Sequence, residues 1–349
     1  MMCTGMNKQI VLKFPIPNSQ METDSELLHD LPPLFRQYKS GRVERFSGAT
    51  AALPSPLDPT TGISSKLAVI DPSTPVSACL YLPPNPPSTS TLPILLYFHG
   101  GAFCIESAFS NTYHPHLTSL TSLARLLVIS VDYRLAPEHP LPAAYDDCWS
   151  AIQWVFSRSD PWLARFGDLR RVFLAGDSAG ANIAHRMAVW AGEKGLGFEG
   201  MALVHPYFWG SEPVGNEGRE KSWRGWMDGL WRAVSGGEKG LDDRWINPAK
   251  EGKEAVAMMG CRRVVVCVAE RDPMRERGRV YWEMLRGSGW RGEVEIVETK
   301  GEGHVFHLEK KTEGDESVRQ LMDVLVRFFR KDPLPEDPDS DYIFSSSSS

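Results

Sequence analysis

The sequence predicts an α/β fold in which a mainly parallel β-sheet is covered by helices on both faces. Short runs of β-branched and aromatic residues alternate with longer segments of helical period, a pattern typical of parallel strands joined by helical crossovers. Several of the short runs are apolar at successive positions, as expected of strands buried on both faces. The chain has 349 residues, a length that α/β proteins often build around one large sheet.

Six strands and four helices are expected along the chain. The strands are residues 94–98, 127–131, 172–175, 201–204, 264–268 and 294–297, and the helices are residues 143–156, 179–191, 280–285 and 317–329. Apolar residues of the last helix fall on one face, which should dock on the sheet. The Pro-, Ser- and Thr-rich stretch 83–93 is expected to be a surface loop flanked by strands.

Residues 21–331 are expected to form a single domain. A flexible N-terminus (1–20) should precede it, and a disordered acidic and Ser-rich tail (332–349) should follow it. The segment 209–245 breaks the alternation of strand and helix, and it carries three tryptophans among glycines and charged residues. It is either an insertion over the functional face of the sheet or an ordinary helix with packed tryptophans. These residues are Trp223, Trp226 and Trp231.

Charge and composition favour a small-molecule partner. The formal net charge is −6, and no Lys/Arg cluster is dense enough to follow a phosphate backbone, so nucleic acid is not expected. There is no run of about 18 uninterrupted apolar residues, which argues against a membrane span.

The cysteines and the N-terminus lead to an expected cytoplasmic location. The six cysteines are scattered, without a C-x-x-C pair, as in a reducing compartment. No basic segment followed by an apolar one marks a secretory signal. No set of His, Cys and acidic residues has zinc-ligand spacing, so neither a metal nor a cofactor is expected.

The strongest chemical signal is the segment 176–180, which reads GDSAG. This G-x-S-x-G motif lies between an expected strand and an expected helix, which is the context that a nucleophile elbow requires. The start of the helix also favours developing negative charge. Ser178 is therefore predicted to be an acyl-transfer nucleophile, with Asp177 stabilising the turn. The alternative is a Gly-rich turn with a helix-capping serine.

A second signal is the sequence HGG at residues 99–101, directly after the expected strand 94–98. Ester cleavage turns a carbonyl oxygen into an oxyanion, which preorganised N–H donors must stabilise. The amides of Gly100, Gly101 and Ala179 are the predicted donors. An isolated HGG could also be a plain tight turn.

A base and its acid are expected downstream, because a serine hydroxyl needs a base and the base needs an orienting partner. The strand 264–268 leads to Asp272, and the strand 294–297 leads to His304. The order Ser, Asp, His is that of α/β-hydrolases. Glu270 remains a rival acid, although it lies nearer the strand.

Other residues are assigned lesser roles. His307 lies in an apolar run, where a structural histidine is commoner than a catalytic one. His205 ends a strand and is a candidate for lining the pocket. Aromatic side chains near the motifs, together with the tryptophans of the segment 209–245, are predicted to shape an apolar acyl or alcohol pocket. Those near the motifs are Phe103, Tyr207 and Phe208.

Several longer segments resemble the plant carboxylesterases, in the hormone-sensitive-lipase-like branch of the α/β-hydrolases, over nearly the whole chain. They are residues 38–45 (YKSGRVER), 99–107 (HGGAFCIES), 132–140 (DYRLAPEHP), 205–210 (HPYFWG) and 303–307 (GHVFH). The resemblance implies an α/β-hydrolase fold, the same triad and oxyanion residues, and a small cap contributed by about 21–46 and 209–245.

The resemblance favours a carboxylic ester hydrolase that acts on small to medium acyl esters through an acyl-enzyme. Two other activities in the family stay open, because a fold does not fix a reaction. Dehydratases of 2-hydroxyisoflavanones use similar machinery. Gibberellin receptors share the fold but lack the triad histidine, which is present here as His304. Ala102 stands where many relatives carry a third glycine, and its backbone amide remains.

Overall fold

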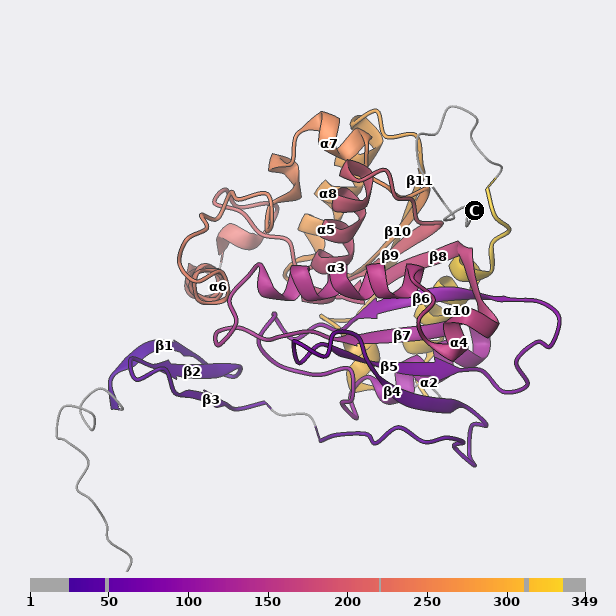
Figure 1. Ribbon diagram of the computed structural model, residues 1–349. Helices are drawn as coiled ribbons and strands as arrows, with labels where there is room; N and C mark the ends of the chain where they lie inside the picture. Colours follow the sequence, from indigo (N-terminus) through magenta and orange to yellow (C-terminus); the bar gives the residue numbers. More distant parts are fainter. Residues whose placement is uncertain (1–24, 48–49, 220, 311–313, 335–349) are drawn as a thin grey trace, which may run out of the picture.

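An eight-stranded β-sheet organises the residues that the computed structural model describes, which are 25–47, 50–219, 221–310 and 314–334 (Figure 1). Its strand order is β11-β10-β9-β8-β6-β7-β5-β4. Neighbours from β11 to β7 pair in parallel, whereas β5 and β4 are antiparallel additions at one edge. The strands are β4 (Ser64–Val69), β5 (Ser77–Leu82), β6 (Leu92–Phe98), β7 (Leu127–Asp132), β8 (Gly167–Asp177), β9 (Gly200–Val204), β10 (Arg263–Ala269) and β11 (Glu293–Thr299).

Helices cover both faces of this sheet (Figure 1). The helices α3 (Ala143–Phe156), α5 (Ala179–Glu193) and α8 (Arg275–Gly287) bury their apolar sides in one core on one face. The helices α2 (His114–Ala124) and α10 (Glu316–Arg330) bury theirs in a second core on the opposite face. The shorter or peripheral helices are α4 (Pro161–Phe166), η1 (Glu217–Arg219), α6 (Lys221–Val234), η2 (Pro248–Lys250), α7 (Lys253–Ala257) and α9 (Phe306–Glu309).

Local sequence explains why these elements form where they do. All seven residues of β10 are buried, as a near-continuous apolar run in a doubly covered strand requires. The side chain of Asp315 accepts hydrogen bonds from the amides of Ser317 and Val318 and so caps the start of α10. In α10 the rings of Phe328 and Phe329 are buried against Phe173 of β8, which holds the helix on the sheet at about 1.5–3 kcal/mol per buried ring.

A separate three-stranded antiparallel sheet lies beside α6 (Figure 1). It consists of β1 (Leu27–Leu31), β2 (Phe35–Tyr38) and β3 (Val43–Arg45). The indole N–H of Trp226 in α6 donates to the carbonyl of Pro32 at 3.0 Å, which joins the two segments although they are far apart in sequence.

The six strands and four helices predicted from the sequence are confirmed. The loop expected at 83–93 is shorter, because β6 begins at Leu92. The elements β1 to β5 and α2 were not predicted individually. Pro115 in the first turn of α2 is typical of a helix start, but Tyr113 at the N-cap makes no side-chain cap hydrogen bond and the first turn has no acidic residue, so the other signals that mark the start of a helix are missing.

The expected ends of the domain fall largely outside the described residues. This is so for 1–20 and for 335–349. Residues 332–334, which the prediction placed in the tail, contact the domain: the carbonyl of Asp332 accepts from Arg263 at 3.1 Å and the amide of Leu334 donates to Glu199 at 3.2 Å.

The topology brings four loops to one edge of the sheet. The five neighbouring strands β11, β10, β9, β8 and β6 are all parallel. The carboxyl ends of β6, β8, β10 and β11 therefore lie at the same edge. Open α/β sheets bind ligands at this edge.

Candidate active site

Ser178 stands at a sharp turn between β8 and α5. Its backbone has φ 52° and ψ −116°, a conformation that residues other than glycine rarely adopt. A Cβ on Gly176 would lie 2.4 Å from the backbone of Gly180, and a Cβ on Gly180 would lie 1.9 Å from the carbonyl oxygen of Phe98. Both positions therefore need glycine. Their lack of a side chain lets the start of α5 contact the end of β6 closely and leaves Ser178 at the apex of the turn.

A continuous chain of hydrogen bonds joins Ser178, His304 and Asp272. Nε2 of His304 lies 3.0 Å from Oγ of Ser178, and Nδ1 lies 2.8 Å from Oδ2 of Asp272. The other carboxylate oxygen of Asp272 accepts from the amide of Met274 at 2.8 Å. The imidazole is thus held between a hydroxyl and a fixed carboxylate, the arrangement in which histidine acts as a general base.

The electrostatics of this pair agree with that geometry. Burial opposes the charged form of His304, but the carboxylate of Asp272 raises its pKa above the ordinary 6.5. Burial likewise opposes ionisation of Asp272, and the positive His304 lowers the pKa of that carboxyl. Because an ionised carboxylate only accepts, Nδ1 of His304 carries the proton and Nε2 faces the serine as an acceptor.

The other candidates for the acid and the base take no part in the hydrogen bonds that join Ser178, His304 and Asp272. Glu270 is exposed, and its carboxylate accepts from the amide of Gly301 at 2.8 Å. His307 is buried, with its ring 4.9 Å from that of His116, and neither of its nitrogens has a hydrogen-bond partner among the described residues. His205 is buried behind His304 and does not line the cavity.

The H-G-G loop is held in place by a tyrosine that was not identified from the sequence. The amide of Gly100 donates to the hydroxyl of Tyr113 at 2.7 Å, and this hydroxyl donates to Oδ2 of Asp177 at 2.9 Å. The hydroxyl of Tyr97 donates to Oδ1 of the same carboxylate at 2.8 Å. Burial raises the pKa of Asp177 to about 6, against the effect of the two tyrosines, so the group is mainly a carboxylate at neutral pH.

The amide of Gly100, predicted to face the substrate, is therefore already engaged. Gly101 and Ala102 line the cavity instead, with positive φ angles of 91° and 53°. Gly101 has no room for a side chain, since a Cβ would lie 2.3 Å from the carbonyl oxygen of Ile105. Among the described residues, no acceptor faces the amides of Gly101, Ala102 or Ala179.

A cavity of about 490 Å³ opens above Ser178 and His304. Residues of α6 contribute to its apolar wall, together with Leu34 from the loop between β1 and β2. The residues of α6 that line it are Trp223, Trp226, Met227 and Leu230. The tryptophan-rich segment is therefore a helix that also faces the site, and Met227, Leu230 and Leu34 were not identified because their spacing does not reveal which cavity they face.

Of the three aromatic residues near the motifs that were predicted for the pocket, only Tyr207 lines the cavity. The ring of Phe103 is fully buried against Tyr145 and Tyr207. Phe208 packs between His185 of α5 and Tyr281 of α8. The prediction for these two residues is wrong, because both rings turn into the core behind the cavity.

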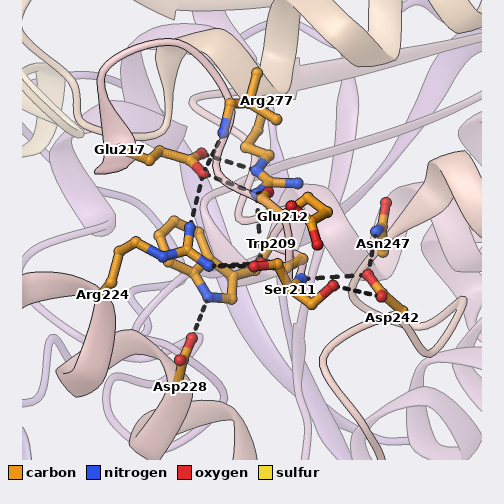
Figure 2. A network of polar contacts seen from close by, with 11 residues as sticks. Trp209, Ser211, Glu212, Glu217, Arg224, Asp228, Asp242, Asn247 and Arg277 are labelled. Atoms are coloured by element: carbon orange, nitrogen blue, oxygen red, sulfur yellow. Dashed lines mark hydrogen bonds and ion pairs between the residues drawn. The ribbon is translucent and has the colours of Figure 1, made fainter. Parts of the chain in front are cut away.

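A buried polar network holds the segment that leads into α6 (Figure 2). The carboxylate of Glu217 receives two hydrogen bonds from Arg277 of α8, at 2.8 and 2.7 Å, and one from Arg224 of α6 at 3.1 Å. Both guanidinium groups lie over the ring of Trp209, at 4.8 Å for Arg224 and 5.3 Å for Arg277. The indole N–H of Trp209 donates to Asp228, also in α6, at 2.8 Å. These contacts fix α6 and its tryptophans relative to the sheet.

The three-stranded sheet is anchored to the loop that carries Gly101. Arg45 of β3 donates to the carbonyl of Cys104 at 2.7 Å and to that of Ala136 at 3.1 Å, and it pairs with both carboxylate oxygens of Glu138. Arginine suits this position because its planar fork can bridge several acceptors.

A family model for the α/β-hydrolase fold matches residues 95–308. Three similar plant proteins cover most of the chain. Tuliposide A-converting enzyme 1, chloroplastic, from Tulipa gesneriana is 48% identical over 88% of this chain and 79% of its own length. Probable carboxylesterase 2 from Arabidopsis thaliana is 43% identical over 82% and 91%. The 2-hydroxyisoflavanone dehydratase from Glycyrrhiza echinata is 44% identical over 82% and 92%.

The fold also resembles solved structures. That of a thermostable esterase from Pseudomonas putida has a TM-score of 0.67 and 22% identity, covering 77% of this chain and 83% of the other.

The expected cytoplasmic location is wrong. The tulip relatives are chloroplastic or amyloplastic enzymes, and this finding overturns the expectation. The expectation rested on the scattered cysteines and on the lack of a secretory signal. The lack of that signal has no bearing on plastid import, because transit peptides lack its apolar segment. No helix within the described part of the chain is long and apolar enough to cross a bilayer.

The matched family model covers more than half of the chain, and the plant relatives extend over most of it. The chain belongs to the α/β-hydrolase fold family and, within it, to the plant carboxylesterases.

Proposed function

We propose that the protein hydrolyses small to medium carboxylic esters through an acyl-enzyme. Ser178 is the nucleophile, His304 the general base and Asp272 its orienting acid. The observation that carries this proposal is the hydrogen-bonded chain through these three residues, which ends at a cavity of about 490 Å³.

The reaction follows from the positions of the groups. Nε2 of His304 accepts the proton of Ser178 as Oγ attacks the ester carbonyl, and the imidazolium is stabilised by Asp272. The alcohol leaves with the proton from His304, and Ser178 keeps the acyl group. A water then gives its proton to the same histidine and attacks the acyl carbon, which releases the acid and restores the serine.

The oxyanion is held by the amides of Gly101, Ala102 and Ala179. Gly100 is replaced by Ala102 in this assignment, because the amide of Gly100 donates to Tyr113. Ala179 is the first residue of α5, where the amides at the helix start have no intrahelical acceptor and the helix dipole favours negative charge.

Tyr113→Phe tests this assignment. The variant removes both the acceptor for the amide of Gly100 and a donor to Asp177, so the loop that carries Gly101 and Ala102 loses its support. We expect kcat to fall about 10- to 100-fold, somewhat less than for loss of an oxyanion donor itself. Steady-state kinetics on a p-nitrophenyl ester provide the measurement.

Tyr97→Phe is the matched control, since it removes the other hydrogen bond to Asp177 and leaves Gly100 untouched. Equal losses in the two variants would contradict a role for Tyr113 in holding the loop.

The pH dependence of kcat/KM should report His304. The base acts only when it is neutral, so activity is full above its pKa and is lost as the pH falls through it. Because Asp272 raises that pKa above 6.5, the acid limb should have its midpoint above this value. A midpoint clearly below 6.5, measured with a substrate that does not itself titrate, would contradict the pairing.

The lining of the cavity by Leu34, next to the three-stranded sheet, and by residues of α6 supports the cap that the resemblance implies, and we assign to this cap the confinement of the acyl group. Esters with short and medium chains should therefore be hydrolysed faster than long ones. The test is a panel of p-nitrophenyl esters from acetate to long chains, with tuliposide A as a candidate natural ester, and Ser178→Ala as the blank. A wild type that is inactive on every ester would overturn the proposal.

A dehydratase is the second candidate, because a relative of that name is 44% identical over 82% of the chain. Elimination of water needs a base and a stabilised oxyanion but no acyl-enzyme. Turnover of a 2-hydroxyisoflavanone together with inactivity on all esters would favour this reading.

A further inference from the structure

His205 lies directly behind the catalytic histidine, in a position that the proposed mechanism does not use. It follows β9, is 1% exposed, and has a left-handed backbone with φ 47°. Its amide donates to the carbonyl of Cys267 in β10 at 2.8 Å. A strand end on the central sheet therefore holds this imidazole rigidly.

One nitrogen of His205 holds the residue that follows His304. The amide of Val305 donates to Nδ1 of His205 at 3.0 Å. Val305 has a φ of 48°, which is unfavourable for a β-branched residue and persists only where surrounding contacts impose it. The hydrogen bond is such a contact, and it fixes the backbone from which the imidazole of His304 extends.

The same bond determines where the proton of His205 lies. A backbone N–H can only donate, so Nδ1 must be unprotonated and the neutral ring carries its proton on Nε2. Burial, and then the positive charge of His304, lower the pKa of His205 to about 3. His205 therefore stays neutral whenever His304 changes its charge.

Neutrality matters because the two rings are neighbours. Their centroids are 5.9 Å apart. One ring nitrogen of His205 lies within 4.8 Å of a carboxylate oxygen of Asp272 and of a ring nitrogen of His304. A charged acceptor or donor at this place would change the pKa of His304 directly. The other groups that face the ring are Phe306, at 5.5 Å, and the buried neutral His307, at 5.7 Å.

We propose that His205 is a positioning residue for His304: as a neutral acceptor for the amide of Val305, it holds the loop after the base in its strained conformation and keeps Nε2 of His304 on Ser178. This rests on the role given to His304 under the proposed function. His205 touches no substrate, so its loss affects the chemical step and not the binding of the ester.

The test compares His205→Phe, His205→Asn and wild type. Phenylalanine keeps a ring but offers no acceptor, and kcat should fall about 10- to 100-fold, the cost of a small misplacement of a catalytic group. KM should change little. Asparagine places an amide oxygen near the position of Nδ1, so His205→Asn should recover part of the loss.

His116→Phe is the matched control for the loss of a buried histidine. Its nitrogens have no hydrogen-bond partner among the described residues, and it does not contact His304. Its kcat should stay near that of wild type. A His205→Phe variant with wild-type kcat, or an equal loss in His116→Phe, would overturn the proposal.

A second measurement does not depend on activity or on the folding of a variant. In wild-type protein labelled with ¹⁵N-histidine, NMR shifts should place the proton of His205 on Nε2 and leave Nδ1 as an acceptor. A proton on Nδ1 would refute the inference. If the wild type hydrolyses no ester, the proposed function fails, whereas the NMR result still decides whether His205 holds Val305.

Discussion

Ser178→Ala and His304→Ala are each expected to lower kcat for a p-nitrophenyl ester by about 10⁶-fold, as for other hydrolases in which a serine and a histidine act as a unit. Without the hydroxyl there is no nucleophile, and without Nε2 the hydroxyl keeps its proton. Because His304 acts only through Ser178, 3.0 Å away, the double variant should be no worse than either single one. Steady-state kinetics with purified proteins of matched melting temperature provide the measurement. Losses that multiply in the double variant would show that the two residues act separately.

Asp272→Asn is expected to lower kcat by about 10⁴-fold. An asparagine amide can donate to Nδ1 of His304, which would then hold its proton on Nε2 and face Ser178 with a donor in place of an acceptor. Geometry is preserved, so the loss isolates the effect on the tautomer. The measurement is kcat on the ester that the panel identifies as best.

Glu270→Gln provides the matched control for this variant. Glu270 is the rival acid, two residues before Asp272, but it is exposed and accepts from the amide of Gly301. Its replacement should leave kcat nearly unchanged. A loss in Glu270→Gln comparable with that in Asp272→Asn would reverse the assignment of the acid.

The sequence is sufficient for the parts of the fold with strong periodicity. Strands such as β10, apolar at nearly every position, and helices such as α10, apolar on one face, can be identified without tertiary information. The antiparallel edge and the three-stranded sheet could not, because short strands such as β3, of three residues, carry little pattern of their own. Their pairing depends on neighbours distant in sequence.

The same division applies to the site. Ser178, Asp272 and His304 can be proposed from chain order because each follows a strand whose carboxyl end must lie at one edge of the sheet. Tyr113 lies in no motif and reaches Gly100 only through the fold. Tyr97 could have been identified, because it lies in a predicted buried strand and a buried tyrosine hydroxyl requires a hydrogen-bond partner, which here is Asp177. Phe103 and Phe208 were misplaced because hydrophobicity does not say on which side of a loop a ring will pack.

The support of the cavity wall likewise depends on distant residues. Glu217 precedes α6 and Arg277 lies in α8, yet together with Arg224 they enclose Trp209 and hold α6 over the site. Removal of one partner from such a buried ion-pair network would leave the charge of the remaining partner uncompensated.

In the proposed mechanism Ser178 carries the acyl group between two chemical steps. Intact-protein mass spectrometry after rapid acid quenching, with an ester whose acyl group is released slowly, detects such an intermediate. Wild type should gain the mass of one acyl group, located at Ser178 by peptide mapping, and Ser178→Ala should gain none. Ester turnover without any acylated protein, or with the acyl group on another residue, would contradict this mechanism.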